Sequence, residues 1–181
     1  HGPSGDEEAV RDLIRQEVET VADEVTIDAM GNLIAHKRRA GPKVMLAAHM
    51  DSVGVIVTHI EENGFLRFGA LGGLEAKALY QTAVQFRSGV SGVISVDEDK
   101  VEKEFKLADL YLDIGAKDVV EAKTMVSIGD TAVFCAPILK NGTRMIAPYL
   151  DNRAGCAALL QAMKEIENPI NDLYFVFTAQ E

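Results

Sequence analysis

The hydrophobic pattern changes twice along the chain, and this change limits the folds open to it. Residues 1–56 and 146–181 combine helical periodicity with short apolar runs, whereas residues 57–145 hold mainly short apolar runs separated by glycines. Helix and strand patterns on both sides of a strand-rich middle are typical of an α/β domain with an insertion. We therefore predict an α/β domain made of 1–56 and 146–181, interrupted by a small β-barrel or sandwich over 57–145.

The outer segments predict two helices, over 6–22 and 152–166, and Ser4 followed by Glu7 matches a capping box at the start of the first. A nearly continuous apolar run begins at Leu173 and predicts a strand over Leu173–Thr178 that is buried on both faces. The other outer strands are expected at 25–28 and 32–36, as a hairpin, and at 43–49. The strands of the middle are expected at 53–60, 65–68, 83–87, 92–96, 110–114 and 131–135, with one short helix near 118–123.

Composition excludes several classes of protein. With 48% hydrophobic and 25% charged residues, the 181-residue chain has enough apolar content to fold, but no window approaches the ~18 apolar residues that a membrane span needs. Its formal net charge of -10 argues against nucleic acid or an anionic membrane as a partner. Cys135 and Cys156 are too few for a disulfide scaffold, so we expect a reduced, cytoplasmic protein.

His49 and Asp51 form the first candidate for a site. They follow an apolar run, at the carboxyl end of a predicted strand, where parallel α/β sheets bind their ligands. If the strand continues, both side chains point to the same face, and a carboxylate beside an imidazole is the usual surrounding of a metal-bound histidine. The alternative is a surface histidine that happens to lie beside an acid.

Asp151 and Glu181 are the other candidates. Asp151 stands at the start of the second helix, as either a helix cap or a carboxylate that bridges two metal ions. Glu181 follows the last apolar strand, where partial burial suits a general base, although an ordinary exposed acid would look the same. Together, nitrogen and oxygen ligands at such junctions favour a zinc-like divalent ion.

Short motifs also occur in a fixed order along essentially the whole chain. They are Gly2-Pro3-Ser4-Gly5-Asp6-Glu7, Asp28-Ala29-Met30-Gly31-Asn32, His49-Met50-Asp51-Ser52-Val53-Gly54, Leu71-Gly72-Gly73, Asp113-Ile114-Gly115-Ala116, Gly129-Asp130, Asp151-Asn152-Arg153-Ala154-Gly155 and Thr178-Ala179-Gln180-Glu181. Each is weak alone, but the ordered set resembles the cytosolic di-metal aminopeptidases of the glutamyl and deblocking family. Members of that family form tetrahedral dodecamers, and some were once described as cellulases or endoglucanases.

The resemblance implies a role for each candidate. His49 resembles a ligand of one metal, Asp51 the acid that orients it, Asp151 the bridging carboxylate and Glu181 the general base. The peptide bond after the residue equivalent to Asp151 is often cis in such enzymes. The implied fold is a phosphorylase/peptidase-like α/β/α catalytic domain, incomplete here, interrupted by an inserted small β-barrel dimerisation domain. The implied cofactors are two divalent metal ions, zinc or cobalt, and the implied partners are peptide substrates and further copies of the chain, from dimers up to a dodecamer.

The family pattern also leads us to expect a fragment. In the family a second glutamate follows the general base and binds metal, and a later aspartate and histidine complete the sites, whereas this sequence stops at Glu181 and opens at His1 without an initiator methionine. Only His49 and Asp151 then remain as ligands. We expect an empty or weakly occupied metal site, and a chain that is inactive or incomplete on its own.

The predicted function is metal-dependent hydrolysis of N-terminal residues from peptides by an aminopeptidase. In a complete enzyme of this kind, water activated by two metal ions attacks the peptide carbonyl, and Glu181 takes up its proton. Two alternatives stay open: a di-metal carboxypeptidase or deacylase on the same scaffold, and a non-catalytic module that mediates self-association.

Overall fold

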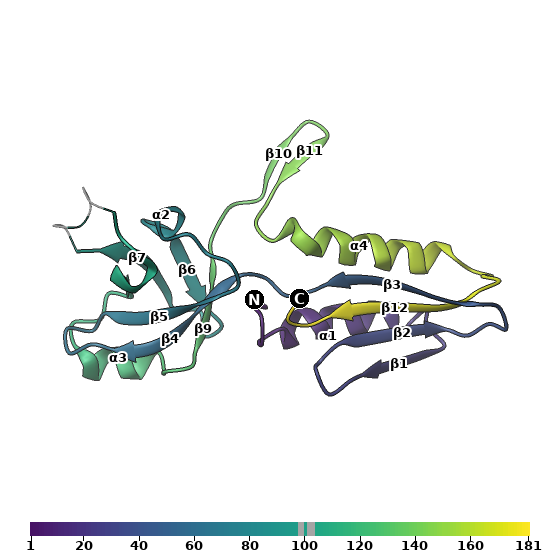
Figure 1. Cartoon of the computed structure of the whole chain (residues 1–181), viewed down its shortest axis with the longest axis horizontal. Helices are drawn as coiled ribbons and strands as arrows, with labels where there is room; N and C mark the ends of the chain where they lie inside the picture. Colours follow the sequence, from purple (N-terminus) through teal and green to yellow (C-terminus); the bar gives the residue numbers. More distant parts are fainter. Residues whose placement is uncertain (98–99, 101–103) are drawn as a thin grey trace. The chain divides into compact units, whose positions relative to one another are not determined.

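The computed structural model describes residues 1–97, 100 and 104–181. The chain divides into two compact units, one made of His1 and Val53–Pro148, and the other of Gly2–Ser52 and Tyr149–Glu181 (Figure 1). Each unit contains a hydrophobic core of its own. Among the described residues, no helix has the length and apolarity needed to cross a membrane.

The α/β unit contains a four-stranded sheet in the order β1-β2-β12-β3. Its elements are α1 (Glu8–Val18), β1 (Glu24–Ile27), β2 (Leu33–Lys37), β3 (Lys43–His49), α4 (Leu150–Glu165) and β12 (Asp172–Thr178). Strand β12 pairs antiparallel with β2 and parallel with β3, so that Thr178 lies opposite His49. The predicted hairpin, strands and helices are confirmed, and the parallel pair brings two strand carboxyl ends to one edge of the sheet.

Both helices of this unit cover the same face of the sheet. Their buried side chains share one core with Leu33 of β2 and with Phe175 and Phe177 of β12, all fully buried. The ion pair between Lys164 Nζ and Glu17 Oε2, at 2.5 Å, joins α4 to α1.

The opposite face of the sheet is only partly covered, because no element in the described part of this unit packs over it. On that face Tyr174 and Val176 are half-buried, and Met45 of β3 is 69% exposed. The prediction that the strand Leu173–Thr178 is buried on both faces is therefore wrong for this chain.

Helix α1 is shorter than its periodicity predicted, and it begins differently. Its N-cap residue is Glu7, and no side chain caps its first turn, so the predicted capping box is wrong. The Ser4 hydroxyl instead donates to Asp51, and Glu7 Oε1 accepts the backbone N–H of Gly5 at 2.8 Å. Both side chains bond to groups outside the helix, which the local pattern of the sequence does not reveal.

The second unit is a closed barrel with strand order β4-β5-β8-β7-β6-β9 (Figure 1). Its elements are β4 (Gly54–Ile60), β5 (Leu66–Leu71), α2 (Ala76–Leu79), β6 (Ala83–Phe86), β7 (Ser91–Val96), the 3-10 helix η2 (Leu107–Asp109), β8 (Leu110–Asp113), α3 (Val119–Met125) and β9 (Thr131–Phe134). Alternate residues such as Leu66, Val84 and Ile94 fill the interior and are fully buried. The structure thus selects the barrel over the sandwich.

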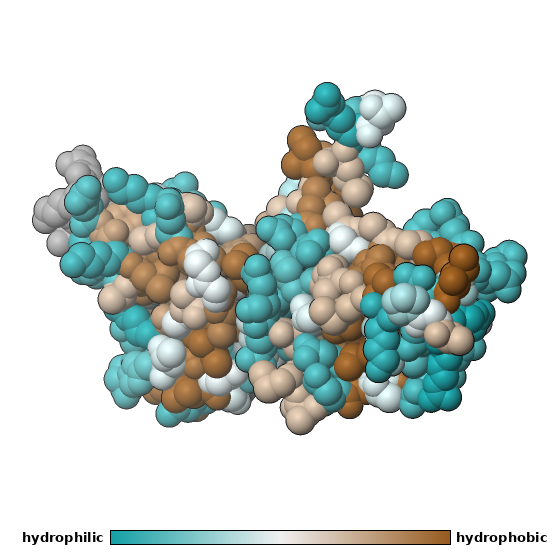
Figure 2. Space-filling view, turned by 45° about the vertical axis from the view of Figure 1, so that its right-hand side comes forward, coloured by the Kyte–Doolittle hydropathy of each residue, from teal (hydrophilic) through white to brown (hydrophobic). Residues whose placement is uncertain are grey.

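A short hairpin made of β10 (Leu139–Asn141) and β11 (Arg144–Ile146) follows the barrel strands. Its apolar side chains are exposed, including Leu139, Met145 and Ile146, and apolar surface is visible on it (Figure 2). The sequence pattern did not predict these strands, because three residues are too short a run to show alternation.

Candidate functional site

The four candidate side chains meet at the edge of the sheet where β3 and β12 end. His49 Nδ1 lies 3.0 Å from Asp51 Oδ1, and His49 Nε2 lies 3.0 Å from Asp151 Oδ1. The same Nε2 atom is 3.9 Å from Glu181 Oε2. The fold therefore brings all four residues together around one imidazole, although they come from three distant parts of the sequence.

Asp51 is the buried acid of this cluster, with 4% of its surface exposed. Its Oδ1 atom faces His49 and also accepts the backbone N–H of Glu181 at 3.3 Å, while its Oδ2 atom accepts the hydroxyl of Ser4. A buried carboxylate needs such donors, because an unpaired buried charge is costly. The contact with Asp51 favours a proton on Nδ1, and the 3.0 Å contact between Nε2 and the Asp151 carboxylate needs either a second proton on Nε2 or a cation between the two atoms.

The electrostatics at His49 favour positive charge. Burial lowers the pKa of the imidazole, but the hydrogen bond to Asp151, the charge of Glu181 and the contact with Asp51 outweigh it, so that the pKa lies above its ordinary value. Three carboxylates around one imidazole therefore attract a cation, either a proton or a metal ion.

The donor set suits a divalent metal ion but is small. The imidazole nitrogen of His49 and the carboxylate of Asp151 are ligand types that zinc accepts, and they face each other directly. A zinc site uses at least three protein ligands, and the described residues contain no group of three histidine, cysteine or acidic side chains arranged to hold a metal. His49 and Asp151 are therefore chemically suitable ligands, but they supply only part of the set that a zinc ion needs.

The start of α4 is irregular where it carries Asp151. The peptide bond between Asp151 and Asn152 is cis, as the family resemblance implied. The N-cap residue of α4 is Tyr149, in the left-handed region, and Asp151 has φ -88° and ψ 109°, which are not helical angles. Asp151 is therefore not the cap of this helix, and its carboxylate faces His49 instead.

Helix α4 packs against the backbone of His49. The buried Cys156 thiol donates to the carbonyl oxygen of His49 at 3.3 Å, and burial raises its pKa to about 11. A Cβ on Gly155 would clash with Asn152 Oδ1 and lie 3.1 Å from the Cβ of Ala48, so glycine leaves room for the Asn152 side chain and for β3 beside the helix. Near the start of the same helix, Arg153 Nη2 donates to the carbonyl oxygen of Gly2 at 3.2 Å, and burial lowers the pKa of the guanidinium.

The side chain of Glu181 is more exposed than the sequence predicted. Its side chain is 76% exposed, so the partial burial predicted for a general base is not observed in this chain. Its place near His49 is instead defined through its backbone, which donates to Asp51.

The sequence pattern assigned Ser4 and Glu7 only a helix cap and gave Asn32 and Arg153 no role, although all four lie in the ordered motifs. In the structure Ser4 donates to Asp51, while Glu7 and Asn32 accept the backbone amides of Gln180 and Ala179, the two residues before Glu181. The available signal was that backbone amides leaving a strand end need acceptors, and short polar residues in glycine-containing turns can supply them.

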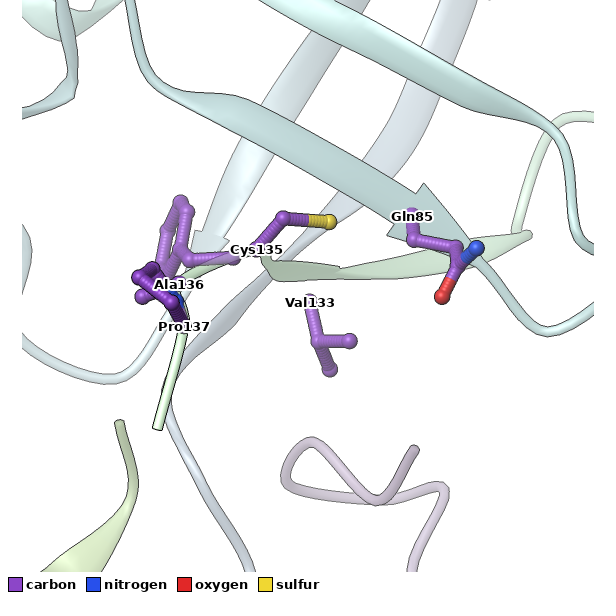
Figure 3. A pocket seen from close by; sticks show the side chains of 6 residues that line it. Gln85, Val133, Cys135, Ala136 and Pro137 are labelled. Atoms are coloured by element: carbon purple, nitrogen blue, oxygen red, sulfur yellow. The ribbon is translucent and has the colours of Figure 1, made fainter. Parts of the chain in front are cut away.

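A separate pocket of about 400 Å³ lies in the barrel unit, lined by β6 and β9 and the residues after β9. Its lining is mostly apolar, with the Cys135 thiol and the amide of Gln85 as its polar side chains (Figure 3). It contains none of the four candidate residues.

The chain is similar to known proteins both in sequence and in fold. A sequence profile of the M42 glutamyl aminopeptidase family matches residues 31–181. The chain is 45% identical to a predicted aminopeptidase of Acetivibrio thermocellus over 99% of its own length, and 35% identical to the lysyl aminopeptidase of Pyrococcus furiosus, also over 99%. It spans only 55% and 56% of the lengths of these two relatives.

A solved structure shows the same architecture. The Pyrococcus horikoshii TET1 peptidase, which assembles into a tetrahedron or a large octahedral shell, matches the whole chain with a TM-score of 0.90 and 33% identity. The chain covers 58% of that protein. The mixed α/β fold with its closed barrel is therefore shared with this assembly-forming peptidase.

Proposed function

Since the chain belongs to the M42 glutamyl aminopeptidase family, we propose that it carries part of the active site of a metal-dependent aminopeptidase. The observation that supports this most directly is the convergence of His49, Asp51, Asp151 and Glu181 at one sheet edge. The family supports a hydrolase, and the proposal adds the metal and the role of each residue.

In this proposal His49 Nε2 and the Asp151 carboxylate hold a divalent cation, zinc or cobalt, and Asp51 orients the imidazole. The bound ion supplies Lewis-acid chemistry, because it lowers the pKa of water and polarises a peptide carbonyl. Glu181 Oε2, at 3.9 Å from His49 Nε2, takes a proton from the attacking water. The same carboxyl group then gives the proton to the leaving amine, and a free N-terminal residue is released.

The chain spans about half the length of the relatives it matches, so we propose that further metal ligands lie outside it. Two ligands do not hold zinc firmly, and the chain alone is then inactive or only weakly active. The support for this is the lack of a three-ligand group within the described residues.

We also propose that the barrel unit mediates self-association and that peptides are the substrates. The support is the likeness of the chain to a peptidase that can assemble into a tetrahedron or a large octahedral shell. Both cysteines are free thiols, which agrees with a reduced, cytoplasmic location.

The experiment compares aminoacyl p-nitroanilides with their N-acetylated forms, using the chain and the full product of its reading frame. We expect the full product to cleave only substrates with a free amine, to lose activity on chelation, and to regain it with Zn²⁺ or Co²⁺. Cleavage restricted to N-acylated substrates would replace the proposal with a deacylase. Self-association of the protein without cleavage of any substrate would support the alternative of a non-catalytic module that mediates self-association.

A further inference from the structure

The three backbone amides that follow β12 each donate to a side chain from a different part of the chain. Ala179 N donates to Asn32 Oδ1 at 2.8 Å, Gln180 N to Glu7 Oε1 at 3.0 Å, and Glu181 N to Asp51 Oδ1 at 3.3 Å. Backbone amides that leave a sheet need new acceptors. Here the acceptors are side chains, so the path of residues 179–181 is defined by groups far away in the sequence.

Two of the three acceptors are oriented by hydrogen bonds of their own. The Nδ2 group of Asn32 donates to Asp28 Oδ2 at 2.8 Å, which turns the amide oxygen of Asn32 toward Ala179. Ser4 donates to Asp51 in the same way. These acceptors are therefore oriented before they meet residues 179–181, and they lose little side-chain freedom in doing so.

Glu7 is the acceptor with the least obvious purpose. It is 5% exposed, and it is the N-cap residue of α1, yet its side chain bonds to no amide of that helix. Its Oε1 atom instead accepts two backbone amides from outside the helix, those of Gly5 at 2.8 Å and Gln180 at 3.0 Å. The side chain of Glu7 therefore supplies an acceptor to two amides outside its helix and none to the helix itself.

Gln180 lies where the chain turns toward the site. Its φ of 51° is in the left-handed region, which residues other than glycine adopt infrequently. The hydrogen bond from its amide to Glu7 stabilises this turn, and the next residue is Glu181, whose carboxylate reaches His49.

We propose that Glu7, together with Asn32 and Asp51, is a positioning residue that sets the location of Glu181 relative to His49. This inference rests on the proposed function, in which Glu181 handles the proton. It also gives a role to the motifs Gly2–Glu7 and Asp28–Asn32. Because the side chain of Glu181 is largely exposed, the bonds to the backbone of residues 179–181 are the main constraint on its position.

The test compares Glu7→Ala with Glu7→Gln, whose amide oxygen can still accept both backbone amides. Glu17→Ala is the matched control, because it removes an exposed carboxylate from the same helix. Amide hydrogen exchange at residues 179–181 is measured by NMR on the chain. The kcat and KM for an aminoacyl p-nitroanilide are measured on the full product of the reading frame.

In Glu7→Ala we expect the Gln180 amide to exchange about tenfold faster or more, because the local opening that exposes it becomes easier. We expect kcat to fall by roughly 10- to 100-fold with KM within about twofold, since a displaced base slows chemistry and not binding. Glu7→Gln should retain most of the protection and most of kcat. Glu17→Ala should match the wild type in both.

Unchanged exchange at Gln180 in Glu7→Ala, or faster exchange with unchanged kcat, overturns the positioning role. If circular dichroism shows that Glu7→Ala does not fold, the Glu7→Gln variant decides. Loss of exchange protection at Gln180 with wild-type kcat in that variant overturns the proposal. Retained protection together with retained kcat supports it. A wild-type protein that cleaves no peptide substrate overturns the proposed function, and the catalytic role of Glu7 falls with it. The exchange data then still report separately whether Glu7 holds residues 179–181.

Discussion

The two units of the chain contrast in how they complete their sheets. In the barrel every strand has a hydrogen-bonded neighbour on both sides, and the inward side chains are covered by the opposite wall. In the α/β unit the sheet has open edges at β1 and β3, helices cover one face, and Met45 on the other face is exposed. The four candidate residues all belong to the unit with the open sheet, where the parallel pairing of β3 with β12 places two strand carboxyl ends side by side. The candidate chemistry lies on the open sheet, at the ends of β3 and β12.

The largest effect is expected for substitution of Glu181, because the proposed chemistry belongs to the α/β unit alone. Glu181→Gln removes the proposed proton acceptor and should lower kcat of the full product by about 10²- to 10⁴-fold. The same change at Glu75, an exposed residue of the barrel unit with no proposed role in the chemistry, is the control and should leave kcat within about twofold. Steady-state hydrolysis of an aminoacyl p-nitroanilide measures both. Equal losses at the two positions would contradict the separation of roles.

The two thiols extend the comparison, because each unit holds one. Cys156 of the α/β unit is buried with its pKa raised to about 11, while Cys135 of the barrel unit is exposed. Raising the pKa of a thiol from 9.0 to about 11 lowers its thiolate fraction near neutral pH by about 100-fold, and burial slows reaction further. Labelling with a disulfide reagent at pH 8 should therefore modify Cys135 at least ~100-fold faster.

The Cys135→Ser variant is the control for this assignment. Its remaining thiol should react slowly in buffer and rapidly in denaturant. Fast labelling of the folded variant would show that α4 does not cover Cys156 in solution.

A third test compares the two faces of β12. Phe175 is fully buried against the helices, and its neighbour Val176 is half-buried on the opposite face. Phe175→Ala should reduce the free energy of unfolding by about 3–5 kcal/mol, because it opens a cavity in the core. Val176→Ala should cost about 1.5 kcal/mol or less, since less of its surface is buried. Urea unfolding measures both, and equal losses would mean that the second face is covered as well.

Glycine positions give a smaller contrast between the units. Gly155→Ala places a methyl group against Ala48 and Asn152 and should destabilise the α/β unit by about 1–3 kcal/mol through overpacking. At Gly73 in the barrel unit, a methyl group would meet no described atom within 4 Å, so Gly73→Ala should change stability by less than about 0.5 kcal/mol. Thermal denaturation of both variants provides the measurement. A larger loss at Gly73 would reverse this contrast.

The weakest effect is a pH dependence in the α/β unit. The backbone amide of Arg39 and a 2.7 Å hydrogen bond with His36 Nε2 lower the pKa of Asp172 below its ordinary value. Since the folded pKa is below the unfolded one, the stabilisation is present above the unfolded pKa of about 3.9 and is lost as the pH falls through the folded pKa. Asp172→Asn should therefore flatten the decline in stability between about pH 5 and pH 2.

Urea midpoints at several pH values measure this slope. Asp12→Asn, which alters an exposed carboxylate of α1, serves as the comparison and should keep the wild-type profile. A profile that is identical for wild type and Asp172→Asn would show that the Asp172 contacts are not formed in solution.

Much of the fold could be predicted from local pattern. Alternating and helical periodicities reflect which side chains can reach a core, so most strands, both long helices and the change to a strand-rich middle were recognisable. The prediction failed where the deciding contact lies elsewhere in the chain. Ser4 and Glu7 matched a capping box. In the structure Ser4 instead donates to Asp51, and Glu7 accepts the backbone amides of Gly5 and Gln180.

The candidate site divides in the same way. By itself the sequence determined the residue types and their places at strand and helix ends, because the carboxyl ends of strands are where polar groups can leave a buried sheet. Only the tertiary structure decided that His49, Asp51, Asp151 and Glu181 meet, since the parallel pairing of β3 with β12 sets which strand ends are neighbours. It also decided that Asn32 and Glu7 accept the backbone amides of Ala179 and Gln180, because hydrogen bonds across more than a hundred residues leave no periodic signal in the sequence.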